Sequence, residues 1–364
     1  FNEFSYFNFE DYFNKNINWE YDKVKEFISN KCVLVTGAGG SIGSEISLTT
    51  IEFKPSKIIL IDHSEENLFN IEKKIIRKNN DYRQKVKIFS YLENIQNFRE
   101  MNSIMESHKP DIIYHAAAYK HVFLSQSNIS SFIKNNLLGT HYLANLAYKN
   151  KVSNFVLVST DKAVRPTNIM GSSKRLAELS VLSNQFKSNN KTKFSIVRFG
   201  NVVNSAGSVL PLFNEQIMYG GPITITHKDV SRFFMLIPDA VGLVLFASTM
   251  SQGGEIYVLD MGKEIKIIDI AKKMANYYGY TIKDKENPNG DIEIKIIGLG
   301  DSEKLHEELS EFSCEKTVEE KVLKSKDSDI EFNNVDEKIK LLLKYIDSND
   351  TNKIKNYLIN NCFK

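Results

Sequence analysis

The chain of 364 residues is 42% hydrophobic and 25% charged, with a formal net charge of +2. This balance predicts a globular protein of one large or two modest domains, whose core needs no disulfide support. A charge so close to zero gives no electrostatic reason to expect nucleic acid as a partner.

Cysteine usage and hydropathy restrict the cellular setting. Cys32, Cys314 and Cys362 are too scattered for a disulfide framework or a metal site, so we expect no metal and a reducing, cytoplasmic compartment. No apolar run approaches the ~18 residues that a membrane helix needs. Because no signal peptide is visible either, we expect a soluble chain without membrane contact.

Residues 1–30 form an aromatic and polar lead-in segment that ends in a short helix around Tyr21–Ile28. From residue 31 to residue 200, short apolar strands alternate with helices. Strands are expected at Val33–Thr36, Lys57–Asp62, Val86–Tyr91, Ile112–Ala117, Phe155–Ser159 and Phe194–Phe199, and helices at Ser41–Phe53, Glu65–Lys78, Phe98–His108, Ile129–Asn150 and Gly171–Lys187. This alternation predicts an α/β fold with a Rossmann-type, doubly wound parallel sheet.

The alternation of strands and helices ends after Gly200, where glycine and proline residues typical of turns separate shorter helices and strands. We expect residues 201–310 to form a smaller, interleaved α/β lobe that binds substrate, with some later segments returning to the first domain. Residues 311–364 are rich in charge and poor in apolar side chains. They are expected to form a peripheral or partly ordered tail that ends in a helix near Val335–Ile346.

The first expected strand runs into a glycine loop at the start of a helix, with glycine at Gly37, Gly40 and Gly43. A glycine loop alone can be a simple turn, but at a strand-to-helix junction it lets the backbone and the helix N-terminus approach a pyrophosphate. The next strand ends in Asp62, which favours NAD over NADP because a carboxylate binds the ribose hydroxyls and repels a 2′-phosphate. The three-and-three glycine spacing resembles the extended short-chain dehydrogenase/reductase family.

The fifth strand is followed by Thr160, Asp161 and Lys162, at the strand end where open parallel sheets bind ligands. Members of the extended family carry a Tyr-x-x-x-Lys pair on the next helix, and here the lysine is Lys174 but the tyrosine position holds Met170. A thioether cannot exchange a proton, so the proton-transfer groups must lie elsewhere. The Asp-Lys pair can be a solvated ion pair on a loop, but its location favours catalysis.

The stretch from Ser159 to Arg175 reads Ser-Thr-Asp-Lys-Ala-Val-Arg-Pro-Thr-Asn-Ile-Met-Gly-Ser-Ser-Lys-Arg. It resembles the UDP-N-acetylglucosamine 4,6-dehydratases of polysaccharide biosynthesis, in the branch with methionine in place of tyrosine. The resemblance runs from about Glu10 to Leu309. Other matching stretches are Tyr114–Val122, Asn135–Thr140, Arg198–Val202, Gly207–Phe213 and Asp229–Met235.

The resemblance implies positions for the ligands. NAD would contact Gly37, Gly40, Ser41, Ile42, Gly43, Asp62, Asn94, Ile95, Ala116, Ala117, Ala118 and Lys174. A UDP-sugar would contact Lys120, His121, Thr160, Asn201, Ser208, Val209, Arg232 and Glu303. Departures from the family pattern are Phe123 and Gln126 for Pro and Glu, Asn94 for Asp, and Gly300-Asp301-Ser302 for Arg-Pro-Gly.

The implied reaction is an NAD-dependent 4,6-dehydration of UDP-N-acetylglucosamine. Lys162 is the leading candidate for removing the C5 proton, Asp161 for aiding loss of the C6 hydroxyl, and Thr160 for orienting the 4-hydroxyl. Met170 would be a spacer beside the sugar. The alternatives are a UDP-glucose 4,6-dehydratase or a UDP-sugar 4-epimerase, and, from another class, a non-catalytic dinucleotide-binding regulator.

The helices expected at Ile129–Asn150 and Gly171–Lys187 carry more apolar positions than one sheet face needs. These positions include Phe132, Leu137, Leu138, Leu143, Leu146, Leu179, Val181 and Leu182. Because related enzymes pair these helices between two copies, we expect at least a homodimer. The alternative is that both apolar stripes belong to the core of one chain.

Overall fold

The computed structural model describes residues 19–82, 85–187, 191–203, 205, 207–300, 302–329, 335–348 and 350–362. The chain divides into two compact units. Among the described residues, the larger unit comprises residues 19–199, Val241–Asp260 and residues 308–362, and the smaller unit comprises Gly200–Ala240 and Met261–Glu307. The expected lead-in segment lies outside the described residues up to residue 18, and α2 (Tyr21–Ile28) confirms the helix at its end.

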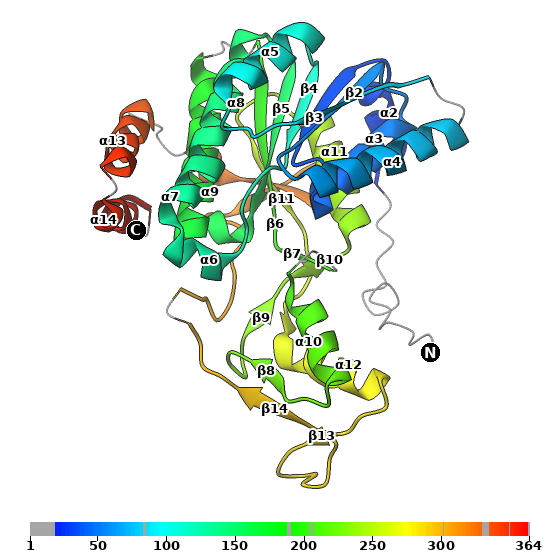
Figure 1. Cartoon of the computed structure of the whole chain (residues 1–364), viewed down its shortest axis with the longest axis vertical. Coiled ribbons are helices and arrows are strands. Elements are labelled where there is room, and N and C mark those ends of the chain that lie inside the picture. The colour runs from blue at the N-terminus through cyan, green and yellow to red at the C-terminus, as the bar shows by residue number, and fades with distance from the viewer. Residues whose placement is uncertain are drawn as a thin grey trace. The chain divides into compact units, whose positions relative to one another are not determined.

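The larger unit is built on a nine-stranded sheet (Figure 1). Its strands are β1 (Cys32–Thr36), β2 (Lys57–Asp62), β3 (Lys87–Leu92), β4 (Ile112–His115), β5 (Asn154–Thr160), β6 (Lys193–Phe199), β11 (Ile256–Leu259), β15 (Cys314–Lys316) and β16 (Val322–Ser325). The order is β15-β16-β11-β6-β5-β4-β1-β2-β3, with every pair from β11 to β3 parallel. Strand order reverses between β1 and β4, which is the point where Rossmann folds bind dinucleotides.

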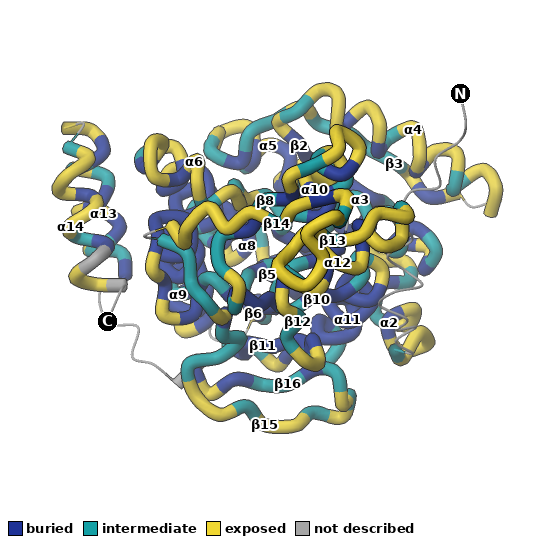
Figure 2. Tube along the Cα trace, turned by 90° about the horizontal axis from the view of Figure 1, so that it is seen from below, coloured by how far each residue is buried: buried dark blue, intermediate teal, exposed yellow. Residues whose placement is uncertain are grey.

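Helices cover both faces of this sheet (Figure 1). They include α3 (Ser41–Glu52), α4 (Glu65–Asp81), α5 (Phe98–His108), α6 (Val122–Ser127), α7 (Ile129–Phe132), α8 (Thr140–Lys149), α9 (Ile169–Lys187) and α11 (Ile237–Met250). The main core lies between the strands and α5, α8 and α9. Helix α9 is buried along almost its whole length (Figure 2).

The helix expected at Ile129–Asn150 is divided in the structure. Helices α7 and α8 flank a π-helical segment, Ile133–Gly139, and α6 precedes them without having been expected. The wider turn lets Asn136 reach inward, and Gly139 leaves room for Ile95, whose Cδ1 would lie 2.6 Å from an added Cβ. Apolar periodicity does not reveal such a segment, because a wider turn confined to seven residues is too short to show a period of its own.

The expectation of a peripheral C-terminal tail is wrong. Strand β16 pairs antiparallel with β11, and β15 pairs with β16, so this segment extends the main sheet. Helices α13 (Val335–Asp347) and α14 (Thr351–Cys362) pack on α7 and α9, and α13 confirms the helix expected near Val335–Ile346. Composition was misleading because several of the few apolar residues of the segment, such as Val322 and Leu342, are completely buried.

The same packing accounts for the apolar stripes that suggested a homodimer. Leu143, Leu146, Val181 and Leu182 lie in the main core of the larger unit. Phe132, Leu137 and Leu138 share a second apolar cluster with α13 and α14 of the same chain, and Leu179 packs against that cluster. Contacts within one chain therefore explain the stripes, and the homodimer stays a prediction.

The smaller unit has its own core and short sheets. Its elements are β7 (Asn201–Val202), α10 (Val209–Met218), β8 (Ile223–Ile225), β9 (Ser231–Arg232), β10 (Phe234–Met235), β12 (Ile265–Lys266), α12 (Ile267–Tyr277), β13 (Ile282–Lys283) and β14 (Ile292–Ile296). Strands β8, β14 and β13 form a parallel sheet, on which α10 and α12 pack. Among the residues that the structure describes, no helix is both long and apolar enough to cross a membrane.

Candidate active site

The loop between β1 and α3 is shaped by backbone contacts that only glycine permits. Gly37 has φ of +64°, and a Cβ there would lie 2.8 Å from the backbone of Ala117. A Cβ on Gly43 would lie 2.0 Å from the carbonyl oxygen of Gly37. The loop is therefore folded tightly against the β4 end, as a close backbone approach to a pyrophosphate requires.

The start of α3 is suited to an anion. Gly40, the residue before the helix, offers no side-chain cap, and the first turn, which includes Ser41 and Ile42, contains no acidic residue. The positive end of the helix dipole and the first-turn N–H groups therefore face a position without competing negative charge. These features fit the pyrophosphate of a dinucleotide.

Asp62 stands at the end of β2, as the sequence predicted, and is almost completely buried. Its Oδ2 accepts the backbone N–H of Gly39 at 2.9 Å and its Oδ1 that of Ser64 at 2.9 Å. A carboxylate has about four lone-pair sites, so acceptor capacity remains for ribose hydroxyls. Asp62 thus both fixes the glycine loop and stays available to a ligand.

The other expected dinucleotide contacts lie at the neighbouring strand ends. Ala116, Ala117 and Ala118 follow β4, where the N–H of Ala116 bonds to the Thr36 carbonyl at 3.1 Å. Past β3, the side-chain oxygen of Asn94 accepts the N–H of Gln96 at 2.9 Å, and Ile95 is buried against Gly139. All these residues gather around the carboxyl ends of β1, β2, β3 and β4.

The turn after β5 brings a hydroxyl, a carboxylate and an amine together. The Asp161 Oδ1 accepts the Thr160 hydroxyl at 2.8 Å and the Lys162 Nζ at 2.9 Å. Asp161 is 0% exposed and the Lys162 side chain is 19% exposed. The Asp161 Oδ2 is buried and has no hydrogen-bond partner among the described residues. A solvated surface ion pair has neither this burial nor such an unsatisfied oxygen, so the pair has the character of a functional site.

Helix α9 carries Met170 and Lys174 in its first turns. Lys174 is buried, which lowers its pKa to about 8, and it donates a hydrogen bond to the Val158 carbonyl at 2.7 Å. Met170 is 2% exposed and belongs to the apolar cluster beside α7, α13 and α14. The methionine therefore packs in the apolar interior in this structure. Its side chain has no titratable group and takes no part in proton transfer.

Sequence reasoning missed two residues that shape this region. Asn136, in the π-helical segment, holds the backbone N–H and carbonyl of Tyr119 at 2.8 and 2.9 Å and bonds to Ser173 of α9 at 3.0 Å. Gly171 packs so tightly that a Cβ there would lie 2.2 Å from the Lys162 carbonyl oxygen. Both residues lie in stretches that matched the family pattern, but their contacts depend on the fold.

Lys120 and His121 follow the segment that Asn136 holds. Lys120 is exposed, and its pKa is lowered by the surrounding protein and then by the positive charge of Lys162. His121 precedes α6, and partial burial followed by the Lys120 charge lowers its pKa. The interaction of Lys120 with Lys162 links this loop electrostatically to the turn after β5.

The smaller unit contains the remaining expected substrate residues. Arg232 is buried and donates to Glu303 Oε1 at 3.0 Å and to the carbonyls of Ser231 and Leu305 at 2.7 and 3.2 Å. Its guanidinium is therefore already engaged, and a diphosphate would have to share it with Glu303. Arg232 and Glu303 are brought together as one pair rather than as two independent ligand contacts.

Asn201 and Ser208, two further residues expected to contact the substrate, lie at the starts of β7 and α10. Asn201 begins β7 and is half-buried. Ser208 precedes α10, which begins at Val209, and its buried Oγ has no hydrogen-bond partner among the described residues. An unsatisfied hydroxyl at a helix N-terminus is suited to an anionic oxygen.

Known proteins resemble this chain over most of its length. The capsular polysaccharide biosynthesis protein CapD of Staphylococcus aureus is 46% identical over 78% of this chain and 45% of its own, so the chain spans about half the length of that relative. The UDP-glucose 4-epimerase of Rickettsia canadensis is 34% identical, and the inverting UDP-N-acetylglucosamine 4,6-dehydratase of Campylobacter jejuni is 32% identical, each with 77% of both chains covered.

A solved structure and a family model agree with these relatives. The X-ray structure of Pen from Bacillus thuringiensis matches with a TM-score of 0.68 at 33% identity, covering 77% of this chain and 81% of the other. The family described as polysaccharide biosynthesis protein matches residues 33–326. This range includes the glycine loop, the turn after β5, and the smaller unit from Gly200 to Glu307. The chain therefore belongs to the polysaccharide biosynthesis protein family.

Proposed function

We propose that this chain binds NAD on the loop after β1 and converts UDP-N-acetylglucosamine to its 4-keto-6-deoxy product by 4,6-dehydration. The observation that carries the proposal is the turn after β5, where the buried carboxylate of Asp161 joins the Thr160 hydroxyl and the Lys162 amine. With Met170 at the tyrosine position, this turn supplies the proton-transfer groups that dehydration needs.

Bound NAD⁺ would supply the redox chemistry, by accepting the hydride of sugar C4 and returning it to C6. Thr160 orients the 4-hydroxyl and relays its proton to Asp161, whose Oδ1 accepts the Thr160 hydroxyl. Lys162 removes the C5 proton, which the neighbouring 4-keto group acidifies, and would return a proton to C5 when the hydride is added at C6. Asp161 donates a proton to the C6 hydroxyl as it leaves as water, and Oδ2 is suited to carry this proton because Oδ1 is already engaged by Thr160 and Lys162.

The remaining residues bind and orient the ligands. Gly37, Gly43 and the start of α3 would hold the pyrophosphate, Asp62 the adenosine ribose, and Lys174 the nicotinamide ribose. Lys120 and Arg232 are the proposed partners of the UDP diphosphate, because both are cations that bind phosphate oxygens.

Incubation of the purified chain with UDP-N-acetylglucosamine, followed by NMR, tests the reaction. We expect a 4-keto-6-deoxy sugar nucleotide, and the nucleotide released on denaturation should be NAD. Stoichiometric NADP, without preference for NAD on reconstitution, would contradict the role given to Asp62. Intact substrate in the presence of bound NAD would support the non-catalytic regulator instead.

A 4-epimerase is the second candidate, because the Rickettsia relative bears that name at a similar identity. The same NMR experiment separates the two activities. An epimerase yields the C4 epimer with its C6 hydroxyl intact, whereas a dehydratase loses that hydroxyl. UDP-glucose, offered in parallel, tests whether the acetamido group is required.

A further inference from the structure

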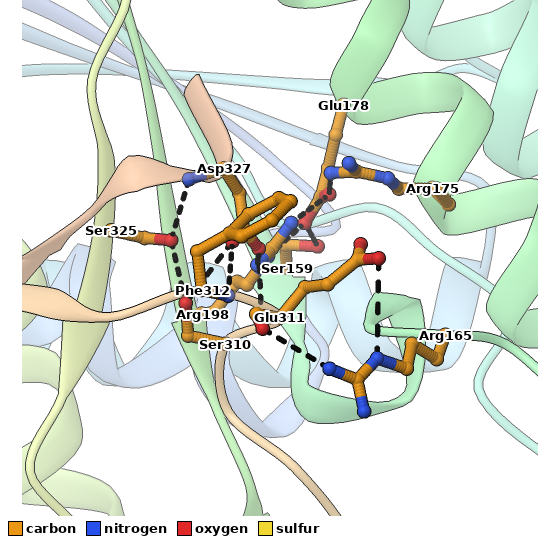
Figure 3. A network of polar contacts seen from close by, with 10 residues as sticks. All are labelled: Ser159, Arg165, Arg175, Glu178, Arg198, Ser310, Glu311, Phe312, Ser325 and Asp327. Atoms are coloured by element: carbon orange, nitrogen blue, oxygen red, sulfur yellow. Dashed lines mark hydrogen bonds and ion pairs between the residues drawn. The ribbon is translucent and has the colours of Figure 1, made fainter. Parts of the chain in front are cut away.

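A cluster of charged side chains is buried below the turn after β5 (Figure 3). Arg198 of β6 is 0% exposed and donates to both oxygens of Glu178 of α9, at 2.8 and 2.7 Å. Its third donor bonds to Asp327, which follows β16 and is 1% exposed. Arg175 donates to Glu178 Oε2 at 3.0 Å. The cluster therefore joins α9 and β6 to the C-terminal segment.

The cluster is electrically balanced, with the two guanidinium groups of Arg175 and Arg198 facing the two carboxylates of Glu178 and Asp327. Burial opposes ionisation of both carboxylates, but the charge and hydrogen bonds of Arg198, together with the other partners of each carboxylate, outweigh this effect and lower the pKa of each. Removal of one carboxylate would leave the remaining three groups with an excess positive charge in the interior, which is the costly case for buried ions.

This cluster is connected to the end of β5. Glu178 Oε1 also accepts the Ser159 hydroxyl at 2.7 Å, and Ser159 immediately precedes Thr160. Lys174 lies one helical turn before Glu178 and bonds to the Val158 carbonyl. Glu178 and Lys174 thus hold β5 from the same helix face, directly before the residues proposed to transfer protons.

The C-terminal segment also holds the far side of the turn (Figure 3). Arg165 has φ of +39°, a backbone conformation that is rare for a non-glycine residue. Its guanidinium donates to Glu308 Oε1 and to the Glu311 carbonyl, both at 3.1 Å. Glu311 in turn donates its backbone N–H to Asp327 Oδ2 at 3.3 Å. Asp327 therefore connects to both ends of the 160–165 turn.

We propose that Asp327 is a positioning residue for Thr160, Asp161 and Lys162, acting through Arg198 and Glu178 on one side and through Glu311 and Arg165 on the other. The inference rests on the proposed function only for the role of those three residues. Asp327 itself touches neither the turn nor a reacting atom. The C-terminal segment, which extends the sheet, is thereby part of the apparatus that sets the site geometry.

The test replaces Asp327 by asparagine in the full chain, which removes the charge and keeps the size. Asp336→Asn is the matched control, because Asp336 pairs with the exposed Lys187 at 2.7 Å in the same C-terminal region. Steady-state kinetics with UDP-N-acetylglucosamine gives kcat and KM, and hydrogen exchange with mass spectrometry follows peptides that cover residues 158–165 and 32–43.

We expect Asp327→Asn to lower kcat about 10²-fold with KM within about twofold, because a small displacement of catalytic groups costs turnover rather than binding. Exchange should rise in 158–165 but not in 32–43, and the control should change neither. A loss confined to thermal stability, with kcat and local exchange unchanged, would show that Asp327 only stabilises the fold and would overturn the proposal.

A second variant covers the case in which Asp327→Asn does not fold. Arg165→Gln removes the contact of the guanidinium with Glu308 and Glu311. Because the Arg165 side chain is 51% exposed, this substitution leaves the packing of the core unchanged. Faster exchange in 158–165 together with a lower kcat is expected, and unchanged values of both would refute the positioning role. If the wild-type chain lacks dehydratase activity, the proposed function fails, whereas the exchange measurements still decide whether Asp327 holds the turn.

Discussion

The loops that follow β1 and β5 are held in place by different kinds of contact. The first is fixed by close backbone packing of Gly37 and Gly43, which lie in the glycine motif, and by Asp62 at the end of the next strand. The second depends on buried ion pairs, one of which joins residues 129 positions apart in the sequence. Backbone packing that only glycine permits can be recognised from a sequence motif, whereas ion pairs between distant segments cannot.

The largest expected effect concerns the chemistry that the second loop supports. Lys162→Met and Asp161→Asn should each lower turnover by about 10²–10⁴-fold while UDP-sugar binding persists, because proton-transfer groups are lost rather than binding contacts. Deuterium wash-in at C5 measures the deprotonation step separately from the hydride step. Wash-in at the wild-type rate in Lys162→Met would assign the base to another residue.

A buried histidine lies beside the first loop, and it should make the stability of the protein depend on pH. The His115 ring is buried between the hydroxyls of Thr36, at 2.6 Å, and Thr140, at 2.8 Å. Burial, aided by the charge of Lys174, lowers the pKa of His115 to about 3. Below pH 6.5 His115 is protonated in the unfolded chain but stays neutral in the folded chain. The contribution of His115 to the free energy of unfolding is therefore fully present above pH 6.5 and is lost as the pH falls toward 3.

This single group should reduce the free energy of unfolding by up to about 3 kcal/mol between pH 6.5 and 4.5. Denaturant unfolding at a series of pH values measures the slope. In the variant His115→Gln, the free energy of unfolding should depend less steeply on pH over this range. The difference in slope should correspond to the uptake of up to one proton on unfolding. Equal slopes in the two proteins would show that His115 is not held neutral.

Two glycine substitutions compare positions within the first loop. A Cβ on Gly43 would lie 2.0 Å from the Gly37 carbonyl oxygen, whereas one on Gly40 would lie 3.3 Å from the same atom. Gly43→Ala should displace the loop at a cost of about 1–3 kcal/mol, which raises the NAD dissociation constant about 5- to 150-fold. Gly40→Ala is the milder control, and calorimetric titration of both variants should rank them in this order.

The smallest expected effect is at Met170. Met170→Leu conserves volume and polarity, so stability should change by less than about 1.5 kcal/mol and much of the activity should remain. Met170→Tyr should bring no gain, because a larger phenol would enter a cluster in which the methionine is 2% exposed. A faster Met170→Tyr enzyme would show that the turn after β5 is not the main source of proton transfer.

Much of the larger unit could be predicted because its elements have strong local signals. The strand Lys57–Asp62 and the helices Tyr21–Ile28 and Phe98–His108 have the predicted bounds. The expected Thr160, Asp161 and Lys162 do form one hydrogen-bonded group. The errors fell where contacts are non-local, as in the π-helical segment around Asn136 and in the C-terminal strands.

Sequence alone was enough to reveal the glycine loop, the parallel sheet, the methionine at the tyrosine position and the family resemblance. These features follow from short-range rules: the strand and helix periods, glycine conformations, and the inability of a thioether to carry a proton. The burial of Asp327 against Arg198 and the pairing of Glu303 with Arg232 became apparent once the fold was known. Such pairs are decided by the fold, because a charge is stable in the interior only where another segment brings a partner to it.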